Sequence, residues 1–175
     1  MHINFEFKAR CSDIDRAEEK LLLSNPVFKG IDHQVDTYFN VPFGRLKLRE
    51  GNIENALIHY HRTDAASAKQ SDVTLYNHRP DASLKEVLTR ALGIKIVVDK
   101  TRKIYFIDHV KFHFDVVKEL GTFLEVEAID KDGTIDITLL KEKCFYYARL
   151  LEVKEADYIA ESYSDLLLAK KSSIV

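Results

Sequence analysis

Charged side chains recur at every second position in five segments that have the alternating pattern of a β-strand. Because residues two apart on a strand point to the same side, each segment carries a charged face opposite an apolar one. In chain order these faces hold Glu6 and Lys8, then Arg45, Lys47 and Arg49, then Lys100 and Arg102, then Lys111, His113 and Asp115, and finally Glu125 and Glu127. Lysine and arginine bind phosphate oxygens, and carboxylates bind hard divalent cations. These residue types therefore favour a ligand that combines phosphate with a metal ion.

Two arrangements of these charged faces are consistent with the sequence. In an antiparallel sheet with one face in water, the charged residues of each strand simply lie in solvent. If the sheet closes into a barrel of about eight strands, with helices outside, the charged faces line an interior wide enough for one small ligand. The cations there would be Lys8, Lys47, Arg49, Lys100, Arg102 and Lys111, and the carboxylates Glu6, Asp115, Glu125 and Glu127. Carboxylates repel a polyphosphate unless a divalent ion lies between them, so this arrangement predicts a polyphosphate bound with Mg²⁺ or Mn²⁺.

Hydrophobic periodicity indicates the strands and helices that position these residues. Strand patterns are present at 2–10, 34–39, 45–50, 56–62, 71–78, 94–98, 100–107, 110–116 and 123–129. Helices are expected at about 13–23, 84–92, 136–151 and 163–170, where apolar residues recur at helical spacing. The polar segment 63–70 is typical of a loop and predicts a long hairpin arm over 63–80. Strands in series without regular βαβ spacing indicate an α+β fold with a mostly antiparallel sheet.

Length, charge and cysteine content limit the class of protein. A chain of 175 residues suits one domain, 1–175. The 26 Lys and Arg against 28 Asp and Glu give a net charge of −2, which argues against nucleic-acid and membrane partners, since these bind basic faces. Cys11 and Cys144 lack CxxC spacing, so we expect free thiols in a reducing compartment. Without a signal-peptide pattern or a long apolar run, the sequence predicts a cytoplasmic protein.

Short motifs along the chain resemble, in order, those of the CYTH superfamily of triphosphate tunnel metalloenzymes. The opening Asn4-Phe5-Glu6-Phe7-Lys8 is similar to the family's Glu-x-Glu-x-Lys, with Asn4 in place of the first Glu. The other motifs are Gln34-x-Asp36-Thr37-Tyr38-Phe39, Leu46-Lys47-Leu48-Arg49, Lys100-x-Arg102, Asp115 and Leu120-Gly121-x-Phe123-Leu124-Glu125-Val126-Glu127. The segment Ser162-Tyr163-Ser164-Asp165-Leu166-Leu167 resembles the C-terminal signature of the branch that includes class IV adenylyl cyclases.

The resemblance implies a fold and a set of site residues. The fold would be a closed eight-stranded antiparallel β-barrel, a triphosphate tunnel, with helices packed outside. The implied metal ligands are Glu6, Glu125 and Glu127. The residues expected to act in catalysis are Lys8, Arg49, Lys100, Arg102 and Asp115, with Asp115 holding a second metal or orienting the nucleophile. The residues expected to bind substrate are Lys47, His61, Arg62 and Lys111.

Family members catalyse more than one reaction. Class IV adenylyl cyclases convert ATP to cyclic AMP and pyrophosphate, whereas other members hydrolyse inorganic, thiamine or nucleoside triphosphates. The C-terminal signature and the expected arm favour the cyclase, and the triphosphatase is the alternative. A third alternative is a catalytically weak polyphosphate-binding module, because fold does not fix function. Many members are homodimers, so the resemblance also implies that the protein can form a homodimer.

Two positions differ from the family pattern. Asn4 is neutral and offers a metal at most one carbonyl oxygen. His61 stands where the family often has a lysine, although Arg62 follows it. A neutral imidazole holds phosphate less strongly than lysine, and a protonated one makes binding depend on pH.

Overall fold

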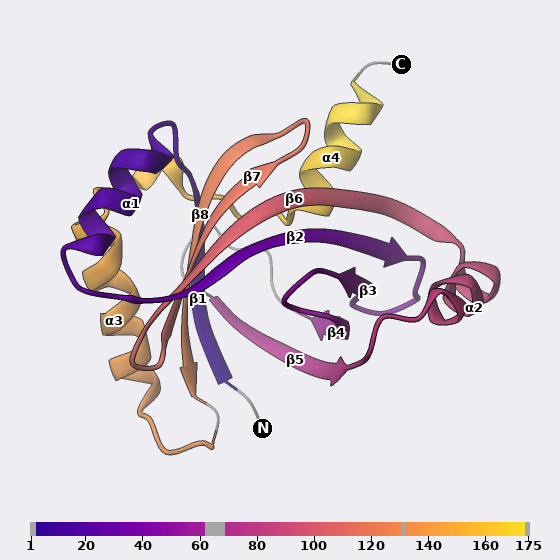
Figure 1. Ribbon diagram of the computed structural model, residues 1–175, viewed down its shortest axis with the longest axis horizontal. Helices are drawn as coiled ribbons and strands as arrows, with labels where there is room; N and C mark the ends of the chain where they lie inside the picture. Colours follow the sequence, from indigo (N-terminus) through magenta and orange to yellow (C-terminus); the bar gives the residue numbers. More distant parts are fainter. Residues whose placement is uncertain (1–2, 62–68, 131, 174–175) are drawn as a thin grey trace.

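The computed structural model describes residues 3–61, 69–130 and 132–173. These ranges form strands, α-helices and one turn of 3-10 helix (Figure 1). The strands are β1 (Ile3–Arg10), β2 (Val27–Phe39), β3 (Arg45–Glu50), β4 (Ala56–His61), β5 (Lys69–Asn77), β6 (Ile94–Ile107), β7 (Val110–Val117) and β8 (Gly121–Asp130). The helices are α1 (Ile14–Leu22), α2 (Ala82–Leu92), α3 (Ile137–Leu150) and α4 (Tyr163–Ser172), with the 3-10 turn at Glu155–Asp157. The expected α+β class is confirmed.

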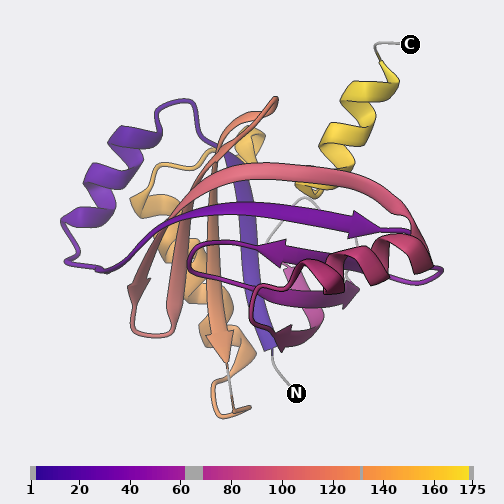
Figure 2. The ribbon, with the colours of Figure 1, turned by 45° about the vertical axis from the view of Figure 1, so that its right-hand side comes forward.

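All eight strands belong to one curled antiparallel sheet. The order of pairing is β1-β5-β4-β3-β2-β6-β7-β8, and β8 pairs in turn with β1. The β1–β8 ladder runs the whole length of β1, whereas the β1–β5 ladder covers only Ile3 to Glu6. The sheet therefore forms a barrel-like wall in which β2 and β6 are the longest strands and a short ladder joins β5 to β1 (Figures 1 and 2).

Two strands are longer than the sequence pattern predicts. β2 begins at Val27 rather than at residue 34, and its ladder with β6 contains an irregularity between Phe28 and Gly30. β6 is continuous, whereas the pattern predicted separate strands on either side of Asp99. Asp99 is partly exposed, and its carboxylate lies 3.3 Å from Nε2 of His33 on β2. A charged residue at this position therefore marks the outer face of one long strand and does not end it.

On β1, β7 and β8 the apolar faces lie outside the barrel, under the helices. On β1, Phe5, Phe7 and Ala9 are buried in a core that α1 and α3 cover. A second core includes Leu167 of α4 and Phe123 of β8, and Phe123 is on the same face of β8 as Glu125 and Glu127. Because side chains alternate along a strand, burying the residues of the first core outward directs the intervening charged residues of β1 into the barrel. No helix in the described ranges is long and apolar enough to cross a membrane.

Candidate active site

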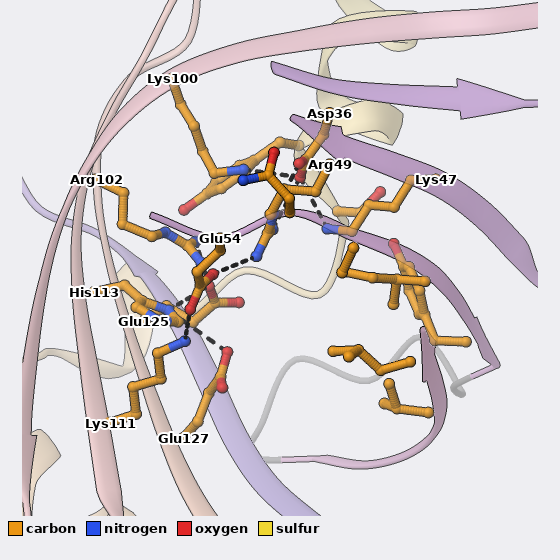
Figure 3. Close-up of a pocket in the computed structure, with 18 of the residues that line it drawn as sticks. Asp36, Lys47, Arg49, Glu54, Lys100, Arg102, Lys111, His113, Glu125 and Glu127 are labelled. Atoms are coloured by element: carbon orange, nitrogen blue, oxygen red, sulfur yellow. Dashed lines mark hydrogen bonds and ion pairs between the residues drawn. The ribbon is translucent and has the colours of Figure 1, made fainter. Parts of the chain in front are cut away.

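A cavity of about 500 Å³ opens inside the curled sheet (Figure 3). Strands β1, β2, β3, β6, β7 and β8 line it with charged side chains. The cations are Lys8, Lys47, Arg49, Lys100, Arg102 and Lys111, and the carboxylates are Glu6, Asp36, Glu54, Glu125 and Glu127. Among the described lining residues, positively and negatively charged side chains are therefore almost equal in number.

Asp36 holds three of these cations at one end of the charged region. Its carboxylate accepts hydrogen bonds from Lys47 (2.9 Å) and Lys100 (2.8 Å). Arg49 donates through Nε to Oδ1 (2.8 Å) and through Nη2 to Oδ2 (3.0 Å). Although burial opposes ionisation, the three cations hold the pKa of Asp36 well below its usual range. Asp36 is therefore a fixed anion that positions cations from β3 and β6.

A second group of ion pairs surrounds Arg102. Its guanidinium donates to both oxygens of Asp115 (2.6 Å each) and, through Nη2, to Glu125 (2.7 Å). The Tyr163 hydroxyl donates to Asp115 (2.7 Å). Lys8 lies 3.0 Å from Glu125, and its ammonium is 4.3 Å from the centre of the Tyr163 ring. Against the effect of burial, Lys8 and Arg102 hold the pKa of Glu125 well below its usual range.

His113, Glu125 and Glu127 gather on neighbouring strands in a way that fits a metal ion. One ligand atom from each lies within 4.8 Å of the others. Burial and the carboxylates of Glu125 and Glu6 raise the pKa of Glu127 to about 7, against the opposing effect of Lys111. Burial and the nearby cation of Arg102 lower the pKa of His113 to about 3, so its ring is neutral. Carboxylate oxygens suit Mg²⁺ and Mn²⁺, so this set of donors fits the expected metal.

The β3–β4 loop contributes one more carboxylate, that of Glu54. Its two oxygens bind cations from different strands, Arg49 of β3 (3.0 Å) and Lys111 of β7 (2.5 Å). Gln34 of β2 also donates to it (3.1 Å). Lys111 and Arg49 hold the pKa of Glu54 below its usual range, although burial opposes this.

The remaining wall of the cavity is mainly apolar. It is formed by β4, the described part of β5 and the segments beside them. The residues are Tyr38, Ile53, Ala56, Ile58, Tyr60, Val73 and Leu75. The cavity therefore has a charged region and an apolar region side by side.

Most of the residues expected from the sequence do meet in this cavity. They are Glu6, Lys8, Lys47, Arg49, Lys100, Arg102, Lys111, Glu125 and Glu127. Asp115 is placed differently, because it is fully buried behind Arg102 and is not among the lining residues. His61 is a correction, since it is exposed and its ring stacks on Phe43 with 4.6 Å between ring centres. The inward face of β4 carries Ala56, Ile58 and Tyr60, and strand alternation therefore turns His61 outward.

Some expectations fall outside the described part of the chain, and some residues of the site were missed. Arg62 and the side chain of Asn4 are not among the described residues. Asp36 was recognised in a motif but given no role, although its alternation with Gln34 and Tyr38 on β2 places it inward. Glu54 lies in a loop, where no periodic signal marks an inward position.

Comparisons with known proteins agree with this fold. No curated protein matches the chain. The PH1012 protein from Pyrococcus horikoshii is similar in structure, with a TM-score of 0.81, 24% identity and coverage of 93% of this chain and 98% of that one. A candidate adenylate cyclase from Vibrio parahaemolyticus gives a TM-score of 0.74, 18% identity and coverage of 94% and 97%.

The candidate adenylyl cyclase HpAC1 from Hippeastrum, with a dominant triphosphatase activity by its description, gives a TM-score of 0.65, 10% identity and coverage of 98% and 96%. At these identities the likeness concerns the fold. The family model for the CYTH domain matches residues 2–163, nearly the whole chain. The chain therefore belongs to the CYTH domain family.

Proposed function

We propose that the protein is a metal-dependent enzyme that acts on a triphosphate held in this cavity. The observation that carries the proposal is the convergence of six cations from four strands on one enclosed space. Five carboxylates line the same space, so its net positive charge is small compared with that of a fully ionised triphosphate. A divalent ion that enters with the triphosphate supplies the missing positive charge.

The proposed metal ligands are Glu6, Glu125 and Glu127, with His113 beside them. When bound, Mg²⁺ or Mn²⁺ would neutralise phosphate charge and activate an oxygen nucleophile. Glu125 is already held by Lys8 and Arg102, so its carboxylate is oriented before any metal arrives.

Phosphate binding is assigned to the cations that line the cavity. Lys8, Lys47, Arg49, Lys100, Arg102 and Lys111 all present donors to the cavity. Because phosphoryl chemistry depends mainly on positioning and charge stabilisation, these donors would stabilise the charge that builds up on the leaving phosphate. Asp115 acts as a positioning residue, because it binds both Nε and Nη2 of Arg102 from behind.

The apolar wall favours an organic triphosphate over inorganic triphosphate. Ile58, Tyr60, Val73 and Leu75 would contact a base or ring, whereas inorganic triphosphate would leave this surface against water. Within this class, conversion of ATP to cyclic AMP and pyrophosphate is the first candidate reaction. In it, the ribose 3′-hydroxyl attacks the α-phosphorus while Arg49 and Lys100 hold the departing pyrophosphate. Hydrolysis of the terminal phosphate is the alternative, and one structural relative is described with that activity.

Product analysis separates these reactions. The purified protein is incubated with ATP and Mg²⁺ or Mn²⁺, and the products are resolved by chromatography. Cyclic AMP with pyrophosphate supports the cyclase, ADP with phosphate supports the triphosphatase, and tight binding without turnover supports a binding module.

The same assay on Arg49→Ala shows whether the products come from this cavity. Loss of a preorganised charge partner should lower turnover by a factor on the order of 10². A change of less than threefold would contradict the assignment of Arg49. The single domain over 1–175 and the homodimer remain predictions.

A further inference from the structure

Glu54 is an acidic side chain that lies among the cations assigned to phosphate. In Figure 3 it stands between Arg49 on one side and Lys111 on the other. One oxygen binds Nη1 of Arg49 at 3.0 Å, and the other binds Nζ of Lys111 at 2.5 Å. An anion with two oxygens bridging two cations of separate strands has the contacts that a phosphate group would make there.

The backbone that carries Glu54 is held firmly. Asp32, which is fully buried, accepts hydrogen bonds from the backbone amides of Ile53 (2.9 Å) and Glu54 (3.0 Å). The Asn55 side chain bonds the backbone of Gly51 in both directions, at 3.1 and 2.8 Å. A Cβ added at Gly51 would lie 2.7 Å from a carboxylate oxygen of Asp32, so the loop packs closely at this point.

The side chain of Glu54 is more exposed than that of the other carboxylate that binds Arg49. It remains 27% exposed, whereas the side chain of Asp36, the other carboxylate that binds Arg49, is only 2% exposed. Release of the Glu54 carboxylate from Arg49, Lys111 and Gln34 requires rotation of the side chain and no movement of the loop.

We propose that Glu54 is an internal counter-ion that competes with substrate phosphate for Arg49 and Lys111, and that it thereby selects the metal-bound triphosphate over the metal-free one. The inference rests on the proposed function. A metal-free triphosphate meets the Glu54 carboxylate as a like charge, which disfavours binding at short range. A metal-bound triphosphate carries less negative charge and is repelled less. Glu54 is thus a specificity-determining residue for the charge state of the ligand.

The test is a binding titration with a triphosphate that the enzyme cannot consume. The probe is the bis-methylene analogue of ATP, in which carbon replaces both the α,β- and the β,γ-bridging oxygen. Calorimetry gives its dissociation constant in EDTA and in excess Mg²⁺ for the wild type and for Glu54→Gln, which keeps the size of the side chain and removes its charge. The dissociation constant in EDTA divided by the dissociation constant in Mg²⁺ measures how strongly binding depends on the metal.

We expect that ratio to fall about tenfold or more in Glu54→Gln, mainly through tighter metal-free binding. The matched control is Glu50→Gln, because Glu50 lies on the same hairpin and pairs with Lys85 at 2.7 Å outside the cavity. This control should keep the wild-type ratio. Glu54→Asp shortens the reach of the carboxylate and should give an intermediate ratio; it also serves if the glutamine variant does not fold.

Two results would overturn the inference. An unchanged ratio in Glu54→Gln would show that the carboxylate does not compete with phosphate. Weaker binding in Mg²⁺ would show that Glu54 holds the ligand or its metal instead. Failure of the proposed function gives a different result, in which neither the wild type nor the Glu50→Gln control binds the probe in Mg²⁺.

Discussion

Lys100 is a buried cation of the cavity whose protonation depends on its surroundings. It is almost fully buried, with its ammonium 2.8 Å from Asp36. Burial lowers the pKa of Lys100 to about 7, because the cations Arg49 and Arg102 offset the opposing effect of Asp36. A phosphate in the cavity would raise this pKa again, since it adds negative charge.

This lowered pKa makes stability depend on pH in a known direction. Between pH 7 and the usual lysine pKa of 10.5, the unfolded chain binds more protons than the folded one, so the free energy of unfolding rises with pH. In Lys100→Met this contribution disappears. Urea unfolding between pH 7 and 8.5 should therefore show a shallower rise in the variant, by up to about 1.4 kcal/mol per pH unit. Parallel pH profiles for the two proteins would contradict the lowered pKa.

At the level of single residues, strand alternation predicted the site where the strands are regular. Glu6, Arg102 and Glu127 were found because every second residue of β1, β6 and β8 faces inward. His61 was misplaced because its position was taken from the family motif and not from the alternation of β4. Glu54 could not be predicted, since its position depends on hydrogen bonds from a loop to Asp32.

At the level of elements, α4 connects the end of the chain to the phosphate-binding residues. Ser162 begins the helix with a capping box, in which its side chain and that of Asp165 each accept a backbone amide hydrogen bond. Asp165 also binds Arg45 of β3 at 2.8 Å. These contacts place the Tyr163 hydroxyl against Asp115, and Asp115 in turn holds Arg102.

Removal of the Tyr163 hydroxyl should therefore weaken the fold through α4. In Tyr163→Phe, Asp115 loses a hydrogen bond while fully buried, which should lower the free energy of unfolding by about 1–3 kcal/mol. Urea unfolding measures this change. Tyr146→Phe, on the exposed side of α3, is the control and should change stability little. Equal free energies of unfolding for the two variants would show that the hydrogen bond from Tyr163 to Asp115 does not stabilise the packing of α4.

The sequence predicted which helices and strands are present better than it predicted where each of them begins and ends. The four helices and the strand order along the chain agree with the periodicity. The first half of β2 was missed because Val27, Phe28 and Ile31 are exposed there, so no clear alternation of buried and exposed residues marks it. Pairing with β6 determines this part of the strand, and such long-range contacts leave no local pattern in the sequence.

At the level of the whole molecule, a ligand that binds across the barrel should stabilise the fold. A metal-bound triphosphate at about 100 times its dissociation constant should add about 2.7 kcal/mol to the free energy of unfolding. For a chain of this size, the melting temperature should rise by about 5–10 °C. Thermal unfolding with and without triphosphate, in the presence of Mg²⁺, measures the shift. An unchanged melting temperature would contradict binding within the barrel.

The pairing of cations with carboxylates has a consequence for how tightly a ligand can be held. Lysine and arginine side chains lose much rotational freedom when a ligand fixes them, and that loss normally weakens association. Here Asp36, Asp115 and Glu125 immobilise Arg49, Lys100 and Arg102 when the chain folds. These side chains therefore lose their rotational freedom on folding and not on binding. An incoming phosphate meets donors that are already fixed in position.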